Sequence, residues 1–96
     1  MRYAKRIDSN QTEIIAAFER LGCQVLVVGE PVDLAIVMPG SSRNVFVEVK
    51  DGSKPPSARK HTPQQVKFFA DWRGDKATVS SLEDVINLVK LFNSTG

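Results

Sequence analysis

Residues 32–50, with the sequence VDLAIVMPGSSRNVFVEVK, constrain the fold more than any other stretch of the chain. Apolar residues occupy every second position on both sides of the segment PGSSR, whose composition is typical of a turn. This pattern predicts two antiparallel strands joined as a hairpin, each with one face toward a core. The core-facing side would carry Val32, Leu34, Ile36 and Met38 from the first strand and Val45, Val47 and Val49 from the second.

The other face of this hairpin carries charged residues at its open end. Glu48 and Lys50 point to that face, and Asp33 begins the first strand on the same side. Because the start of the first strand lies near the end of the second, Asp33 is expected opposite Glu48 or Lys50. Two carboxylates brought together there repel each other unless a positive charge lies between them, and a hard divalent cation accepts such oxygens readily. The pattern predicts a Mg²⁺ site, with the backbone carbonyl of Val49 available as a further ligand.

Lys50 lies two residues beyond Glu48, roughly 6 to 7 Å along the strand. From there its ammonium can hold a water beside the metal or offset charge on a phosphate oxygen, so the set suits phosphodiester hydrolysis. A simpler interpretation stays open, in which Glu48 and Lys50 form an exposed same-face ion pair worth about 0.2 to 1 kcal/mol. Asp33 would then be a strand-edge or turn residue after Pro31. The combination of Asp33 with Glu-x-Lys favours the metal site.

The rest of the chain predicts three helices and two further strands around the hairpin. In chain order we expect a helix at 8–21, strands at 23–30, 32–38 and 44–50, a loop at 51–60, a helix at 61–74, a strand at 77–81 and a helix from Ser80 or Ser81 to 92. Ser9 or Asn10 can cap the first helix and Gly22 can end it, while Thr62 and Pro63 start the second. This order predicts an α/β fold with a mixed four-stranded sheet flanked by helices, in which residues 1–96 form a single domain.

Several classes of protein are excluded by composition. The longest apolar runs, QVLVVG and LAIVM, are too short to span a bilayer, so no membrane partner is expected. The segment MRYAKRIDSNQ lacks the apolar stretch of a secretory signal, which favours a cytoplasmic location. Cys23 is the one cysteine, so it can form neither an internal disulfide nor a zinc cluster. We expect Cys23 to be a small core residue and not a catalytic thiol.

A basic segment follows the Glu-x-Lys strand. The net charge of +2 is modest, but no acidic residue lies between Asp51 and Asp71. Such a segment can contact backbone phosphates of a nucleic acid without reading the base sequence, although a plain solvated loop is the simpler interpretation. The predicted DNA-binding residues are Lys54, Arg59, Lys60, His61 and Lys67.

The hairpin sequence resembles the signature of the PD-(D/E)xK nuclease superfamily, in which an Asp starts one strand and a Glu-x-Lys ends the next. With the segment ARKHTPQQ after it, the chain is similar to the VRR-Nuc family, particularly its minimal stand-alone members from bacteria and bacteriophages. The resemblance spans about residues 10–90. The chain departs from the family pattern directly before Asp33, where it has Val32 and not Pro. The resemblance implies a restriction-endonuclease-like core. It also implies a Mg²⁺-dependent endonuclease in which Mn²⁺ can substitute for Mg²⁺. The expected location is a bacterial or phage-infected bacterial cell.

Applied to this chain, the resemblance implies a role for each residue of the site. Asp33 and Glu48 become metal ligands beside the Val49 carbonyl, and Lys50 becomes the catalytic lysine. It also implies that Glu13 is an acidic residue near the metal and that Gln65 is the glutamine of the following helix. Glu13 and Gln65 have an alternative role, since each can close a capping box, with Asn10 and Thr62 respectively. His61 could act as a general base, but a phosphate contact or plain solvent exposure fits its place before the helix better.

The substrate and the assembly are further expectations. So small a nuclease has little surface for reading bases, and the resemblance implies recognition of branched DNA such as four-way junctions. Symmetrical cutting of a junction needs two active sites, which a homodimer supplies. On the last helix Leu82, Val85, Ile86, Val89 and Phe92 form an apolar stripe, widened by Leu88 and Leu91, which would serve either a dimer interface or the core. A non-catalytic DNA-binding module of the same fold and a sequence- or mismatch-directed endonuclease remain the alternatives.

Overall fold

The computed structural model describes residues 10–51 and 61–94, and within them the helices and strands follow the predicted order. The elements are α1 (Gln11–Arg20), β1 (Gln24–Val27), β2 (Leu34–Val37), β3 (Asn44–Val49), α2 (Pro63–Asp71), β4 (Lys76–Val79) and α3 (Leu82–Ser94). Strands β1 and β2 are shorter than predicted, because the amides of Val28 and Gly29 both donate to the carbonyl of Asp33 and close a loop between them. Gly29 has a φ of +95°, a conformation that glycine adopts without a steric penalty.

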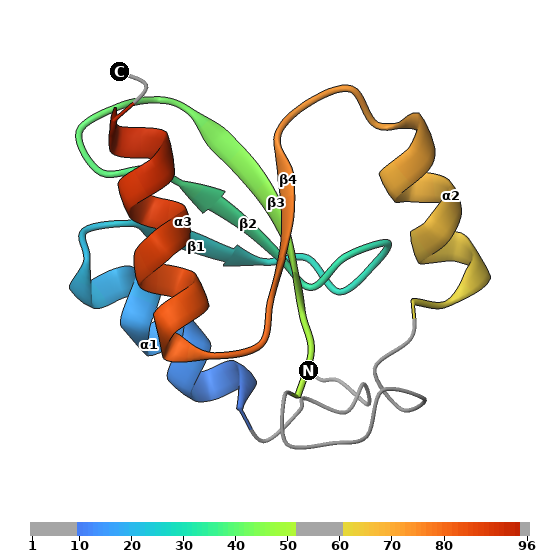
Figure 1. The fold of residues 1–96 in the computed structure, drawn as a ribbon, viewed down its shortest axis with the longest axis horizontal. Coiled ribbons are helices and arrows are strands. Elements are labelled where there is room, and N and C mark those ends of the chain that lie inside the picture. The colour runs from blue at the N-terminus through green and yellow to red at the C-terminus, as the bar shows by residue number, and fades with distance from the viewer. Residues whose placement is uncertain (1–9, 52–60, 95–96) are drawn as a thin grey trace.

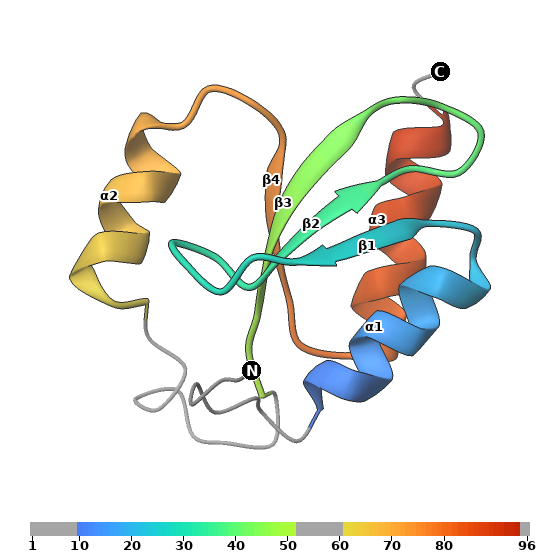
Figure 2. The same ribbon diagram turned by 180° about the vertical axis from the view of Figure 1, so that it is seen from behind.

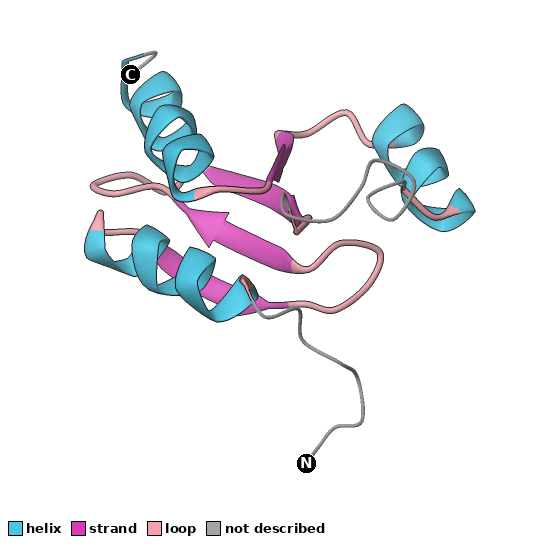
Figure 3. Ribbon diagram, turned by 60° about the horizontal axis from the view of Figure 1, so that its bottom comes forward, coloured by secondary structure: helices cyan, strands magenta, loops and turns pink. Residues whose placement is uncertain are grey.

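The four strands form one mixed sheet in the order β1-β2-β3-β4. Strands β1, β2 and β3 are antiparallel neighbours, whereas β4 runs parallel to β3. Helices α1 and α3 lie side by side against one side of the sheet, and α2 stands on the opposite side (Figures 1 and 2). Figure 3 shows the same division, with α2 well separated from the other two helices. The predicted α/β class and mixed four-stranded sheet are therefore confirmed.

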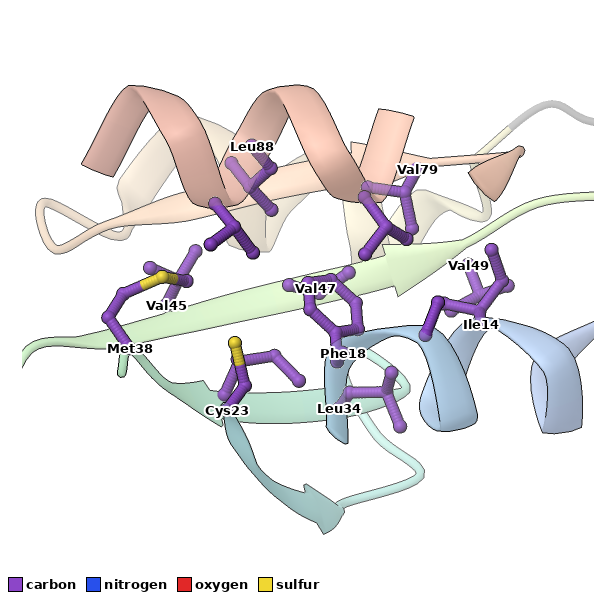
Figure 4. Close-up of a cluster of buried hydrophobic side chains, with 14 residues drawn as sticks. Ile14, Phe18, Cys23, Leu34, Met38, Val45, Val47, Val49, Val79 and Leu88 are labelled. Atoms are coloured by element: carbon purple, nitrogen blue, oxygen red, sulfur yellow. The ribbon is translucent and has the colours of Figure 1, made fainter. Parts of the chain in front are cut away.

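The hydrophobic core fills the space between the sheet and the helix pair α1 and α3 (Figure 4). The three valines of β3 that were predicted to face inward have exposed fractions of 1% or less, and Phe18 of α1 is fully buried against them. Full burial of each such side chain contributes about 1.5 to 3 kcal/mol. Cys23 belongs to the same cluster, and burial raises the pKa of its thiol, which disfavours the reactive thiolate. The prediction that Cys23 is a core residue is confirmed.

Side-chain caps start α2 and α3, whereas the predicted cap of α1 by Asn10 does not form. The side chain of Thr62 accepts a hydrogen bond from the amide of Gln65 at 3.2 Å, and Gln65 Oε1 accepts one from the amide of Thr62 at 3.0 Å. This is the predicted capping box of α2. The hydroxyl of Ser81 caps α3 by accepting from the amide of Asp84. Asn10 occupies the N-cap position of α1, but its side chain makes no capping bond, so the capping box with Glu13 is absent.

Helix α3 uses only part of its apolar surface in the core. Val85, Leu88 and Val89 are buried, whereas Leu82, Ile86 and Leu91 have exposed fractions of 44%, 43% and 57%. The predicted stripe is therefore divided, since Val85 and Val89 are buried whereas Leu82 and Ile86 are not. The core takes only part of the apolar surface of α3, and the rest faces outward. None of the helices within the described ranges has the length and apolar character needed to traverse a bilayer.

Candidate active site

Asp33 and Glu48 lie close together at the open end of the hairpin. The last pair of β2 and β3 at this end is Leu34 with Val47, and extending this register by one residue sets Asp33 opposite Glu48. From the sequence, either Glu48 or Lys50 could lie opposite Asp33. The register of β2 and β3 assigns Glu48 to that position. The amide of Val49 donates to Asp33 Oδ2 at 2.8 Å, which fixes the carboxylate of Asp33 against the end of β3.

Glu48 is the most deeply buried acidic residue in the described part of the chain, with an exposed fraction of 4%. Its Oε2 accepts a hydrogen bond from Gln65 Nε2 at 2.6 Å and lies 3.2 Å from the ammonium of Lys50. Its Oε1 is also buried, but it has no hydrogen-bond partner among the described residues. Since a buried carboxylate oxygen without a partner is costly, this oxygen marks a place where a cation would stabilise the protein.

The electrostatic surroundings of Glu48 lead to the same conclusion. Burial raises the pKa of the Glu48 carboxyl, and the nearby negative charge of Asp33 raises it further. Hydrogen bonds from Lys50 and Gln65 lower the pKa of Glu48, but by less than burial and Asp33 raise it. The folded protein therefore disfavours the ionised form of Glu48 in the absence of a further positive charge.

The ion pair between Glu48 and Lys50 exists, but it is not the surface pair of the simpler interpretation. The two side chains have exposed fractions of only 5% and 15%. A surface ion pair is hydrated and worth little, whereas burial of these charges is costly unless they have a further function or further partners. The placement of Asp33 beside them favours the interpretation as a site.

The ligands available in this site suit a small hard cation. Two carboxylates and the backbone at Val49 provide oxygens, and no group of three His, Cys, Asp or Glu side chains is gathered in residues 10–51 and 61–94. Mg²⁺ typically takes one or two carboxylates from a protein and keeps several of its own waters, so this donor set fits. Glu13 is exposed in the first turn of α1 and is not gathered with the other two acids.

Lys50 is held by contacts that reach it from two other elements. Its ammonium donates to Gln65 Oε1 at 3.2 Å, besides its ion pair with Glu48. Its carbonyl accepts a hydrogen bond from Asn10 Nδ2 at 2.9 Å, which attaches the start of α1 to the end of β3. This role of Asn10 was not predicted, because the residue was interpreted as a local cap. A polar residue at a helix start gives no signal for such a long-range contact.

The predicted DNA-binding residues fall into two groups. Lys54, Arg59 and Lys60 lie outside the described residues. His61 Nδ1 is 3.4 Å from Gln65 Oε1, and its ring packs against that of Phe69 with a centroid distance of 4.9 Å. Lys67 forms an exposed ion pair with Asp71 at 2.8 Å, which raises the pKa of Lys67. Asp71 therefore offsets part of the positive charge that was expected at this position.

The sheet and its flanking helices define a restriction-endonuclease-like α/β fold with an acidic pair and a lysine at one end of the sheet. A solved structure described as a VRR_NUC domain is similar to this chain, with a TM-score of 0.62 and 24% sequence identity. The match covers 86% of this chain and 97% of that one, so the fold expected from the VRR-Nuc resemblance is confirmed. No protein-family model matches the sequence, and no curated protein matches it.

Proposed function

We propose that this chain is a nuclease domain of the VRR-Nuc type that hydrolyses phosphodiester bonds of DNA with the help of Mg²⁺. The observation that carries the proposal is the buried carboxylate of Glu48, which faces Asp33, touches Lys50 and leaves Oε1 without a partner among the described residues. This arrangement costs stability in the folded protein and has an evident use only if a cation and a phosphate enter it.

In this proposal Asp33, Glu48 and the carbonyl of Val49 hold the ion, and Mn²⁺ can substitute for Mg²⁺. Once bound there, the ion supplies Lewis acidity, withdrawing charge from the phosphoryl group and making a neighbouring water more acidic. The ammonium of Lys50 orients the attacking water or stabilises charge that develops on a phosphate oxygen. Gln65 is a positioning residue, since its two amide ends hold Glu48 Oε2 and the Lys50 ammonium in fixed relation.

The other predicted residues have supporting roles. His61, Lys67, Lys54, Arg59 and Lys60 would contact DNA phosphates, and Glu13 would approach the metal from α1 when the ion is bound. Phosphate contacts supply affinity without sequence information. Recognition would then depend on DNA shape, which supports branched DNA, and four-way junctions in particular, as the substrate.

One assay separates this proposal from its alternatives. The purified protein should be incubated with Mg²⁺ or Mn²⁺ and with four matched substrates, namely a four-way junction, a flap, a mismatched duplex and a linear duplex. We expect metal-dependent cutting of the junction at least about tenfold faster than of the linear duplex, which corresponds to about 1.4 kcal/mol. Preference for a mismatch or for one linear sequence would favour the other class of endonuclease. DNA binding with no cutting in either metal would instead favour a non-catalytic module.

We also propose a homodimer, and the outward side of α1 and α3 supports it. An apolar groove of about 130 Å³ lies there, lined by Ala17, Arg20, Leu21, Leu82 and Ile86. Its leucines and isoleucine are partly exposed, although apolar side chains of this size are usually covered in a stable assembly.

Light scattering at micromolar concentration should give about twice the chain mass of 10.6 kDa. The substitution Ile86→Lys should shift the protein toward the monomer, because a charge would be buried in the interface. The substitution Asn87→Lys, at an exposed neighbouring position, is the matched control and should leave the mass unchanged. A wild-type protein with the mass of one chain would contradict the homodimer.

A further inference from the structure

Beside the candidate active site, an open groove of about 310 Å³ runs between α2 and the loop that joins β1 to β2. Figures 1 and 2 show this loop extending toward α2 from both viewing directions. The groove is lined by Pro31, Gln64, Lys67, Phe68, Asp71 and Trp72. Its volume is near the lower limit of small-molecule sites, about 300 Å³, so it suits one ring system better than a large ligand.

Phe68 and Trp72 form the aromatic wall of this groove, and Phe46 packs against both rings. Trp72 lies nearly parallel to Phe68, with an interplanar angle of 17° and a centroid distance of 5.6 Å. Phe46 of β3 meets both of them edge-on, at 5.2 Å from Trp72 and 5.7 Å from Phe68. Despite these contacts Trp72 keeps an exposed fraction of 42%. The cluster therefore holds a large aromatic surface in a defined orientation toward solvent.

The residues that follow Trp72 leave room for its indole and bind its backbone. A Cβ atom added at Gly74 would lie 2.6 Å from the indole Nε1, so the glycine leaves the space that the indole occupies. The carbonyl of Trp72 accepts a hydrogen bond from Lys76. Gly74 therefore makes room for the indole, and Lys76 at the start of β4 holds the backbone of Trp72.

Residues of the groove and of the candidate active site are near neighbours along the chain. Phe46 precedes Glu48 by two residues on the same face of β3, a separation of about 7 Å along the strand. Gln64 is the chain neighbour of Gln65, which binds Glu48, and Pro31 lies two residues before Asp33. A nucleotide next to the phosphate at Asp33 and Glu48 would therefore reach the aromatic wall.

The charges at the groove argue for an uncharged occupant. Lys67 and Asp71, its two charged lining residues, form an ion pair with each other at 2.8 Å. Their opposite charges cancel at the rim, so an uncharged group fits inside the groove, and Lys67 is left to reach a phosphate only at the outer edge. A planar uncharged group with polar edges fits a rim of this kind, since Lys67, Asp71 and Gln64 offer both donors and acceptors.

We propose that this groove binds one unpaired nucleobase of the DNA substrate, turned out of the helix beside the scissile phosphate and stacked on Trp72. The inference rests on the proposed nuclease function and adds a requirement for a base that can leave its stack. Every base has a π-face, so stacking on an aromatic side chain tolerates sequence differences. Unpairing is cheapest at branch points, mismatches and single-stranded ends. The groove would thus contribute to selection of branched DNA without base-specific contacts.

The test uses Trp72 as its own reporter, because it is the single tryptophan of the chain. The full chain is titrated, in the presence of a chelator that prevents cutting, with duplexes that carry one unpaired thymidine at successive positions around the cut mapped with Mg²⁺. We expect saturable quenching of tryptophan fluorescence for at least one position. We also expect an abasic nucleotide at that position to abolish the quenching and to weaken binding about 5- to 100-fold.

A double-mutant cycle then measures the coupling between ring and base. Trp72→Leu keeps apolar packing on Phe46 and Phe68 but removes the stacking surface, and should weaken binding by the same 5- to 100-fold factor. With the abasic DNA, Trp72→Leu should have no further effect, whereas Trp72→Phe should retain most of the affinity of the wild type. Asn87→Ala, at an exposed position of α3 outside the apolar groove, is the control and should change nothing. Circular dichroism checks that each variant is folded.

The outcomes distinguish this inference from the proposed function. If the wild type binds and cuts DNA but its fluorescence does not respond at any position, the base site is refuted and the nuclease remains. Additive effects of Trp72→Leu and the abasic nucleotide would refute it equally. A wild type that binds none of these DNAs would overturn the proposed function and the base site together.

Discussion

Replacement of Glu48 with glutamine is expected to abolish metal-dependent DNA cleavage and, at the same time, to make the metal-free protein more stable. The loss of cleavage should be at least about a thousandfold, equivalent to about 4 kcal/mol of transition-state stabilisation. Glutamine keeps the size of Glu48 and an oxygen that can accept from Gln65, but it removes the charge that attracts the cation. The rate of cutting of a four-way junction in Mg²⁺ measures the effect.

The expected gain in stability follows from the raised pKa of Glu48. Since the fold favours the protonated form, Glu48 contributes stability below its unfolded pKa, and this contribution is lost as the pH rises through its folded pKa. At neutral pH the ionised carboxylate therefore destabilises the metal-free protein, and the neutral glutamine should not. Thermal unfolding in a chelator should give a higher Tm for Glu48→Gln than for the wild type at pH 7, and the difference should shrink as the pH falls.

Two further variants make this result specific. Asp33→Asn removes the other acidic charge while its side-chain oxygen can still accept from the amide of Val49, so it should lose cleavage to a similar extent and keep DNA binding. Glu83→Gln changes an exposed acid in the first turn of α3 and should cleave at the wild-type rate. Undiminished cleavage by both Glu48→Gln and Asp33→Asn would end the assignment of this site.

The hairpin and the pair of acids were predictable because both depend on local patterns. Alternation with a period of two fixes the two faces of β2 and β3, and the turn PGSSR places their ends. The exact partner of Asp33 was not predictable, since the register depends on the conformation of the turn. Only the observed pairing of Leu34 with Val47 assigns Asp33 to Glu48.

Gln65 shows why a local interpretation and a functional one need not compete. The sequence offered a capping role and a site role as alternatives, but the side-chain amide has two ends. Its Oε1 accepts from the amide of Thr62 and from Lys50, while its Nε2 donates to Glu48. The cap thus fixes the orientation of the amide that reaches the site. The capping motif was visible in the sequence, and the contact with Glu48 needed the placement of α2 against β3.

The remaining misses have a shared physical cause. Asn10, the buried half of α3 and the aromatic wall around Trp72 all depend on how elements pack across long separations in sequence. An amphipathic pattern shows that a helix has an apolar side, but a wide stripe does not show which part faces the sheet. Phe68 belongs to a helix in which no residue is buried, and Trp72 is the C-cap of that helix, so burial patterns give no signal for their cluster with Phe46.

Divalent cations should stabilise the wild-type protein strongly and the site variants hardly at all. At a metal concentration ten times Kd, binding to the folded state alone contributes about 1.4 kcal/mol, which raises Tm by about 6 to 11 °C for a domain of this size. We expect this stabilisation because a cation would offset the adjacent negative charges of Glu48 and Asp33, and because Glu48 Oε1 has no hydrogen-bond partner among the described residues. Thermal unfolding with and without Mg²⁺ or Mn²⁺, reversed by a chelator, measures this rise in Tm.

Glu48→Gln should lose most of the Tm shift caused by the cation, whereas Glu83→Gln should keep it. An equal shift in Glu48→Gln and the wild type would show that the cation binds elsewhere, and this measurement does not depend on cleavage.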